Sequence, residues 1–177
     1  RYPEFPLPPG EGADACLARL CREGLERRWG RPVPDAARER LDRELAVVAK
    51  LGFAGYFLIV HDIVRHANAE GIPSVGRGSA ANALVSYALG ITHVDPLAHD
   101  LYFERFLNPE RVSPPDIDLD FGWKDRDAIL AWITRKYGRD RTTMICNLNR
   151  FSARSAFREA AKAHGYGERE IGAISRR

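Results

Sequence analysis

Apolar residues recur at three- and four-residue spacing through the first seventy positions, which predicts a run of amphipathic helices. Leu17, Leu20 and Leu25 form the apolar side of the first, and a glycine follows each helix as a stop signal. The third opens with the strongly apolar Tyr56 to Val60 and is therefore expected to be the most buried. The predicted helices cover Ala13–Trp29, about Asp35–Leu51 and Tyr56–Glu70.

The later part of the chain alternates short extended segments with short helices. The extended segments are predicted at Ile72–Val75, Asp116–Phe121 and Thr143–Cys146. Helical segments are predicted at Ala80–Leu89, Phe103–Leu107, Arg126–Tyr137 and from about Ser152 to the end. This mixture predicts an α+β fold.

Three carboxylates alternate with apolar residues in the second of these strands. Because successive side chains of a strand point to opposite faces, Asp116, Asp118 and Asp120 share one face, while Ile117 and Leu119 share the other. Stacked carboxylates repel one another unless a multivalent cation neutralises them, and Mg²⁺ prefers such oxygen ligands. The pattern favours a magnesium site, with acids on an exposed strand edge as the alternative.

A glycine turn follows the first predicted strand and precedes a helix. The backbone N–H groups at that helix start, together with the Ser79 hydroxyl, are suited to a phosphate, and Arg77 adds a positive charge beside it. A non-transferase phosphate or dinucleotide-binding module built on Gly76–Ala81 is the competing interpretation, with Asp95 as the ribose-binding acid. Against that module, Pro73 interrupts its first strand.

Composition and charge narrow the class of protein. A 177-residue chain with 45% hydrophobic residues can bury a core, and it has no apolar run of bilayer length, so no membrane partner is expected. The start lacks both an initiator Met and a signal-like apolar region, so we expect a piece of a longer cytosolic protein. The net charge is +3, yet eleven basic residues against four acidic ones lie from Arg135 onward, which predicts contact with a polyanion there.

A basic stripe lies within that C-terminal part. Arg154, Arg158 and Lys162 are spaced four apart, so they share one side of the predicted helix from Ser152 to Ala163. The stripe suits the phosphate backbone of DNA. A solvated face with Glu159 as the ionic partner is the alternative.

Five segments, in this order, resemble the alpha subunit of bacterial DNA polymerase III, the C-family DNA polymerases. They are LGFAGYFLIV at 51–60, GRGSAA at 76–81, YALGIT at 87–92, FERFLNPER at 103–111 and PDIDLDF at 115–121. The resemblance implies a partial palm domain in residues 1–147 with a polymerase-beta-like nucleotidyltransferase fold and flanking helices. Residues 148–177 would begin the thumb.

The resemblance also implies roles for individual residues. Asp116 and Asp118 would hold two Mg²⁺ ions, with a third catalytic aspartate supplied by a later strand that this chain lacks, so the isolated fragment is expected to be inactive. Gly78 and Ser79 would contact the triphosphate of the incoming nucleotide. Other phosphate contacts would come from Arg77, Arg105 and Arg111, where ion pairs with Glu104 or Glu110 are the alternative.

The implied function is template-directed DNA synthesis in the bacterial cytoplasm. The partners would be primer-template DNA, deoxynucleoside triphosphates and, through parts of the protein outside this chain, other replisome subunits. Ser74-Val75-Gly76 departs from the Gly-Pro-Gly common in replicative members. Ala80-Ala81-Asn82 and Arg154-Ser155-Ala156 are similar to the error-prone branch, and both branches stay open.

Overall fold

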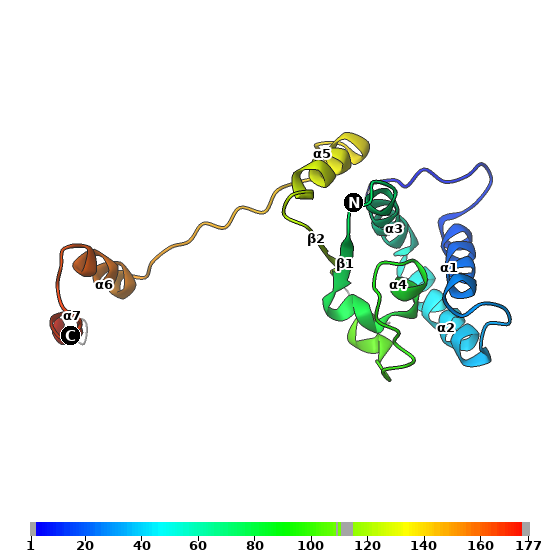
Figure 1. Cartoon of the computed structure of the whole chain (residues 1–177), viewed down its shortest axis with the longest axis horizontal. Helices are drawn as coiled ribbons and strands as arrows, with labels where there is room; N and C mark the ends of the chain where they lie inside the picture. Colours follow the sequence, from blue (N-terminus) through cyan, green and yellow to red (C-terminus); the bar gives the residue numbers. More distant parts are fainter. Residues whose placement is uncertain (1–2, 109, 111–114, 175–177) are drawn as a thin grey trace. The chain divides into compact units, whose positions relative to one another are not determined.

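The computed structural model describes residues 3–108, 110 and 115–174, which belong to two compact units (Figure 1). The first unit is Arg1–Thr142 and the second is Thr143–Arg177. Within these described residues the chain is mostly helical, with a two-stranded sheet, as the predicted α+β class requires.

Three helices open the first unit. Helices α1 (Ala13–Trp29) and α2 (Asp35–Leu51) confirm the predicted bounds, and α3 (Ala54–Ala69) begins two residues earlier than predicted. Gly52 ends α2 because it adopts φ +71°, a left-handed conformation that a residue with a Cβ rarely adopts. The prediction that α3 is strongly buried is confirmed, since Phe57 and Leu58 are fully enclosed.

A short helix, α4 (Leu84–Ala88), lies against α1 and α2, and α1 also packs on α3. Their apolar faces form one core. Its largest fully buried side chains include Leu17, Leu41, Phe57, Leu84, Ile91 and Phe106.

The approach of α1 to α4 is unusually close. A Cβ on Gly24 would lie 2.0 Å from the carbonyl oxygen of Ala88. Arg28 of α1 donates hydrogen bonds to the carbonyl of Tyr87, within α4, and to that of Thr92, beyond it, and its guanidinium stacks on the Tyr87 ring at 4.2 Å. The segment 87–92 is thus held directly to α1.

The predicted helix at Ala80–Leu89 is wrong in its first half. Residues Gly78–Asn82 form a 3₁₀ helix, η1, and Ala83 is extended before α4 begins. The break has a partner on α2, where Arg40 donates to the carbonyl of Asn82 and Glu44 accepts from the backbone N–H of Val85. These bonds satisfy backbone groups that a continuous helix would otherwise pair.

The sheet consists of β1 (Ser74–Arg77) and β2 (Asp118–Phe121), which are antiparallel. The predicted strand Ile72–Val75 is shifted by two residues because pairing with β2 sets its bounds, with Ser74 opposite Phe121 and Arg77 opposite Asp118. A second 3₁₀ helix, η2 (Phe103–Arg105), occupies part of the predicted helical turn.

Helix α5 (Arg126–Tyr137) has the predicted bounds and is anchored to α3. Asp62 of α3 is only 2% exposed and accepts hydrogen bonds from Tyr137, Lys136 and Arg65. Burial raises the pKa of Asp62, but these three donors outweigh it and hold the pKa below its ordinary value. Asp62 is therefore ionised when α5 is docked.

The second unit contains α6 (Ala153–Ala163) and α7 (Glu168–Ile174), which pack against each other. Ser152 caps α6 by accepting a hydrogen bond from the Ser155 backbone N–H at 3.4 Å. The predicted strand Thr143–Cys146 is wrong: these residues are irregular, and Ile145 is 88% exposed. A strand of this composition needs a neighbouring strand, and none pairs with it in the described chain.

Among the described residues, no single helix is both long enough and apolar enough to span a membrane. Helices α2 and α3 meet both requirements only as a pair, bent by 114°.

The close approach at Gly24 makes a stability prediction. In Gly24→Ala the added methyl group collides with the Ala88 carbonyl, so we expect a loss of about 1–3 kcal/mol in the free energy of unfolding, measured by urea denaturation of the chain. Gly55→Ala is the matched control, because a Cβ at this helical glycine meets nothing within 4 Å. It should leave stability unchanged or raise it by up to about 1 kcal/mol. Equal effects of the two substitutions would contradict the packing described here.

Candidate functional site

The acidic segment lies at the edge of the first unit with its carboxylates outward. Exposure alternates along it: Asp116, Asp118 and Asp120 are exposed, while Ile117 and Leu119 pack against the core. The strand starts at Asp118, so the predicted start at Asp116 is two residues too early. Before it, the backbone N–H of Ile117 donates to the Tyr56 hydroxyl of α3 at 3.1 Å. That bond fixes the segment that carries Asp116.

The glycine turn lies directly beside this acidic segment. Pairing of β1 with β2 places Arg77 opposite Asp118. The next residue, Gly78, has φ +72°, and a Cβ built on it would lie 3.3 Å from Asp118 Oδ2. Ser79 follows in η1 and is half-buried. Residues some forty positions apart in the sequence therefore meet at one place (Figure 1).

Gly76 sets the position of β1 on the core. Its backbone N–H donates to the carbonyl of Ile91 at 2.8 Å, and a Cβ there would lie only 2.2 Å from the same oxygen. A larger residue would force β1 away from the segment 87–92. This explains why a glycine stands two residues before Gly78.

Arg77 is the counter-ion of the acidic face. Its Nε lies 2.8 Å from Asp120 Oδ2, and its Nη1 lies 3.8 Å from Asp118 Oδ2. The hydrogen bond to Asp120 and the two negative charges raise the pKa of the guanidinium. All three side chains are more than half exposed, so solvent screens the pairing and it contributes little stability. Arg77 is therefore held loosely.

The exposed carboxylates have the donor chemistry of a magnesium site. Asp116 and Asp118 offer hard oxygen ligands on an exposed surface, which is the donor chemistry that Mg²⁺ accepts. The residues with a described placement contain no cluster of three or more His, Cys, Asp or Glu side chains able to surround an ion. These two carboxylates therefore do not enclose an ion by themselves.

Of the other predicted phosphate-binding arginines, Arg105 ends η2, a segment that contacts η1. The Arg105 side chain is exposed, and within the described part of the chain it forms no ion pair with Glu104 or with Glu110. The flanking Phe103 and Phe106 are buried and anchor the segment. Arg111 lies outside the described residues.

The geometry does not support the dinucleotide-binding alternative. That motif needs a second strand parallel to β1, whereas β1 pairs with the antiparallel β2. Asp95 lies in a turn, where its carboxylate accepts hydrogen bonds from the backbone N–H groups of Leu97 and Ala98. The predicted phosphate cradle also requires an α-helix directly after the glycine turn. The turn is followed instead by η1, a 3₁₀ helix of five residues.

The basic stripe is partly neutralised within the second unit. Arg158 lies 2.7 Å from Glu168, and Lys162 lies near both Glu168 and Glu159. Arg154 is exposed and has no ion pair with any described carboxylate. The solvated-face alternative thus describes Arg158 and Lys162, and it leaves Arg154 available.

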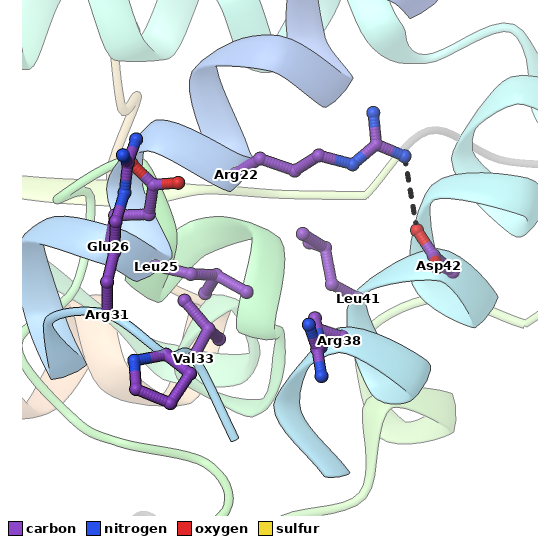
Figure 2. A pocket seen from close by; sticks show the side chains of 9 residues that line it. Arg22, Leu25, Glu26, Arg31, Val33, Arg38, Leu41 and Asp42 are labelled. Atoms are coloured by element: carbon purple, nitrogen blue, oxygen red, sulfur yellow. Dashed lines mark hydrogen bonds and ion pairs between the residues drawn. The ribbon is translucent and has the colours of Figure 1, made fainter. Parts of the chain in front are cut away.

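A separate cavity of about 310 Å³ lies between α1 and α2 (Figure 2). Leu25, Leu41 and Val33 form its apolar part, and Arg22 at its rim pairs with Asp42 at 3.3 Å. No residue of β1, β2 or η1 lines it. The hollow therefore does not belong to the acidic face.

Sequence reasoning missed one pairing and one residue of the site. The pairing of Arg77 with Asp118 and Asp120 could not be predicted, because it depends on the register of strands far apart in sequence. The role of Tyr56 was hidden by its apolar neighbours, which read as core. A tyrosine at the start of so apolar a run was the available signal, because a buried hydroxyl needs a partner.

Comparison with known proteins shows which family this chain matches. Residues 15–177 match the family described as bacterial DNA polymerase III alpha NTPase domain. The chain is 44% identical over 99% of its length to an error-prone DNA polymerase of Symbiobacterium thermophilum, and 46% identical over 95% to one of Bradyrhizobium sp. (strain ORS 278). The matched region spans 16% and 14% of those two relatives.

The position of Arg77 makes a prediction about cation binding. Arg77→Gln removes a competitor for the two carboxylates, so we expect Mn²⁺ to bind at this face up to about fivefold more tightly at low ionic strength. Electron paramagnetic resonance of free Mn²⁺ measures this. Arg105→Gln is the control of equal charge, since it pairs with neither carboxylate. Weaker Mn²⁺ binding by Arg77→Gln would contradict the counter-ion role.

Proposed function

Because the chain belongs to the bacterial DNA polymerase III alpha family, we propose that it forms part of the catalytic core of a DNA-directed DNA polymerase. One observation carries the proposal: Gly78 of the glycine turn lies against Asp118 of the acidic strand. A metal-binding carboxylate and a turn suited to phosphate are the two parts that nucleotidyl transfer needs close together.

Residues 1–147 are assigned to a palm with a polymerase-beta-like nucleotidyltransferase fold, and 148–177 to the start of the thumb. The support is an acidic strand that pairs with β1, which itself packs on α3, while Tyr56 of α3 holds the residue just before that strand. The palm is partial, because the third catalytic aspartate is expected on a strand outside this chain. We therefore expect the 177-residue piece alone to be inactive.

Asp116 and Asp118 would hold two Mg²⁺ ions, which in such enzymes activate the primer hydroxyl and neutralise the leaving pyrophosphate. The protein's own contribution is positioning. The Tyr56 hydroxyl and the β1 pairing fix the backbone on either side of the two carboxylates. Asp120 is two residues further and is already paired with Arg77, which suits an auxiliary role.

The triphosphate would lie along the turn. The absence of a side chain at Gly78 leaves room beside Asp118, Ser79 offers a hydroxyl, and Arg105 offers a guanidinium that pairs with no described carboxylate. Arg77 is held by exposed ion pairs, so it can exchange the carboxylates for a phosphate once cations neutralise the acids. Arg77 would thus pair with the carboxylates, as the structure suggests, and with a phosphate, as the sequence suggests.

The error-prone branch is favoured over the replicative one. The relatives compared above are named error-prone DNA polymerase, and Ser74-Val75-Gly76 differs from the common replicative pattern. The partners would be primer-template DNA and deoxynucleoside triphosphates, with other replisome subunits bound elsewhere in the protein. The site of action would be the bacterial cytoplasm.

The two proposed metal ligands are tested by Asp116→Asn and Asp118→Asn in the intact protein. We expect primer extension to fall by more than about 100-fold, beyond the effect of losing a partner that only orients a ligand. Folding should be unchanged by circular dichroism, because both side chains are exposed. Asp120→Asn is the matched control and should retain most activity. Near-normal extension by Asp116→Asn or Asp118→Asn would refute the assignment.

The basic stripe is tested by the salt dependence of DNA binding. Each phosphate contact that is lost should reduce the slope of log K against log salt by about 0.9. We expect this reduction for Arg154→Gln, because Arg154 has no ion pair with a described carboxylate. Arg158→Gln should change the slope less, because Glu168 already neutralises that arginine. An unchanged slope for Arg154→Gln would favour a merely solvated face.

A further inference from the structure

A second, basic cavity lies away from the acidic face, between α1, α3 and the end of α4. Its volume is about 340 Å³, and Arg27, Arg28, His61, Arg65 and Asn68 supply its polar lining. No carboxylate lines it, so its three arginines give it a formal charge of +3. A hollow with this lining favours an anion.

Two of these groups are fixed by the fold. Arg28 donates to the carbonyls of Tyr87 and Thr92, so its orientation is set before any ligand arrives. His61 Nδ1 lies 3.0 Å from the carbonyl oxygen of Leu89, and only a protonated Nδ1 can bond to that acceptor. In the neutral ring the second nitrogen, Nε2, then carries no proton and can only accept a hydrogen bond.

The positive charges of the cavity affect the pKa of His61. Burial lowers the pKa of the imidazole, the bond to Leu89 opposes this, and the charges of Arg65 and Arg27 lower it further. The net shift is downward, so the ring is neutral at pH 7. A bound anion would offset the two arginine charges that act on the ring.

The remaining two arginines can turn toward a ligand. Arg27 is exposed and has no ion pair with a described carboxylate. Arg65 uses one nitrogen, Nη2, to bond Asp62, and its side chain is 70% exposed, so the rest of its fork is accessible. A guanidinium fork matches the oxygens of a phosphate group.

We propose that this cavity binds a phosphate group, and that the group belongs to a nucleic-acid strand. The oxygens would be held by Arg27 and Arg65, with the amide N–H groups of Asn68 beside them. The arginines at an open rim suit a passing strand better than an enclosed ligand. This site shares no residue with Asp116, Asp118 or the glycine turn, and assigning its phosphate to a nucleic-acid strand rests on the function proposed above.

The location gives the site a structural link to the acidic face. Its wall includes Ala88, Leu89 and Gly90, and the next residue, Ile91, accepts the hydrogen bond from Gly76 that positions β1. A strand bound here would contact the segment on which β1 rests. The cavity wall and the support of β1 thus lie on one continuous segment, residues 88–91.

The experiment measures binding of the intact protein to a primer-template duplex in EDTA, without nucleotide, across a salt series. Arg27→Gln with Arg65→Gln should weaken binding at least tenfold at 0.1 M salt and lower the log–log slope by between one and two. Arg22→Gln with Arg43→Gln is the matched control, with the same change in charge at two arginines outside this cavity. It should change affinity less than twofold.

Parallel titrations with pyrophosphate and with a deoxynucleoside triphosphate identify the source of the phosphate. If the cavity variant weakens binding of pyrophosphate and nucleotide but not of the duplex, the cavity still binds phosphate, but that phosphate belongs to a free nucleotide. Equal effects of the cavity variant and the control on every ligand would overturn the proposal. Arg27→Glu is a second variant at an exposed position, and it tests the site if Arg65→Gln disturbs Asp62. Asp118→Asn should lose extension yet retain this binding, which separates the two proposals.

Discussion

The first unit depends on a buried ion pair within α2. Glu44 is 1% exposed, and its two oxygens accept from the Arg40 guanidinium and from the backbone N–H of Val85. Arg40 in turn donates to the carbonyls of Asn82 and Leu101. Burial raises the pKa of Glu44, and these bonds partly offset it. One pair of side chains thus orders the ends of η1 and the approach to η2, the two segments that carry Ser79 and Arg105.

Two glycines then bring the anchored segments to the acidic strand. Gly76 allows β1 to rest against Ile91, and Gly78 allows the turn to pass within contact distance of Asp118. The approach at Gly76 is to a backbone carbonyl, which cannot move aside, and at Gly78 the constraint is its φ of +72°, which favours glycine. The alignment of turn and acids therefore follows from steric limits at these two positions and from the β1–β2 register, more than from the charge of the site.

The sequence predicted what is determined locally. Helices α1, α2 and α5 have strong periodicity and clear end signals, and their bounds are confirmed. The outward face of Asp116 to Asp120 followed from simple alternation. The limits of β1, the break at Ala83 and the irregular Thr143–Cys146 were not predicted, because each depends on a partner far away in the sequence or on the lack of one. The pairing of Arg77 with the acids belongs to the same class.

The carboxylates of the chain divide into two kinds by their surroundings. Glu44 and Asp62 are buried, and each accepts hydrogen bonds both from its own helix and from another segment, so removing either would leave charged or polar partners uncompensated. Asp118 and Asp120 carry a single loosely held arginine between them and face solvent. A buried acid with fixed donors cannot exchange them for a ligand, whereas an exposed, solvent-screened pair can release Arg77 readily. The same residue type thus supports the fold at one depth and remains available for cations at another.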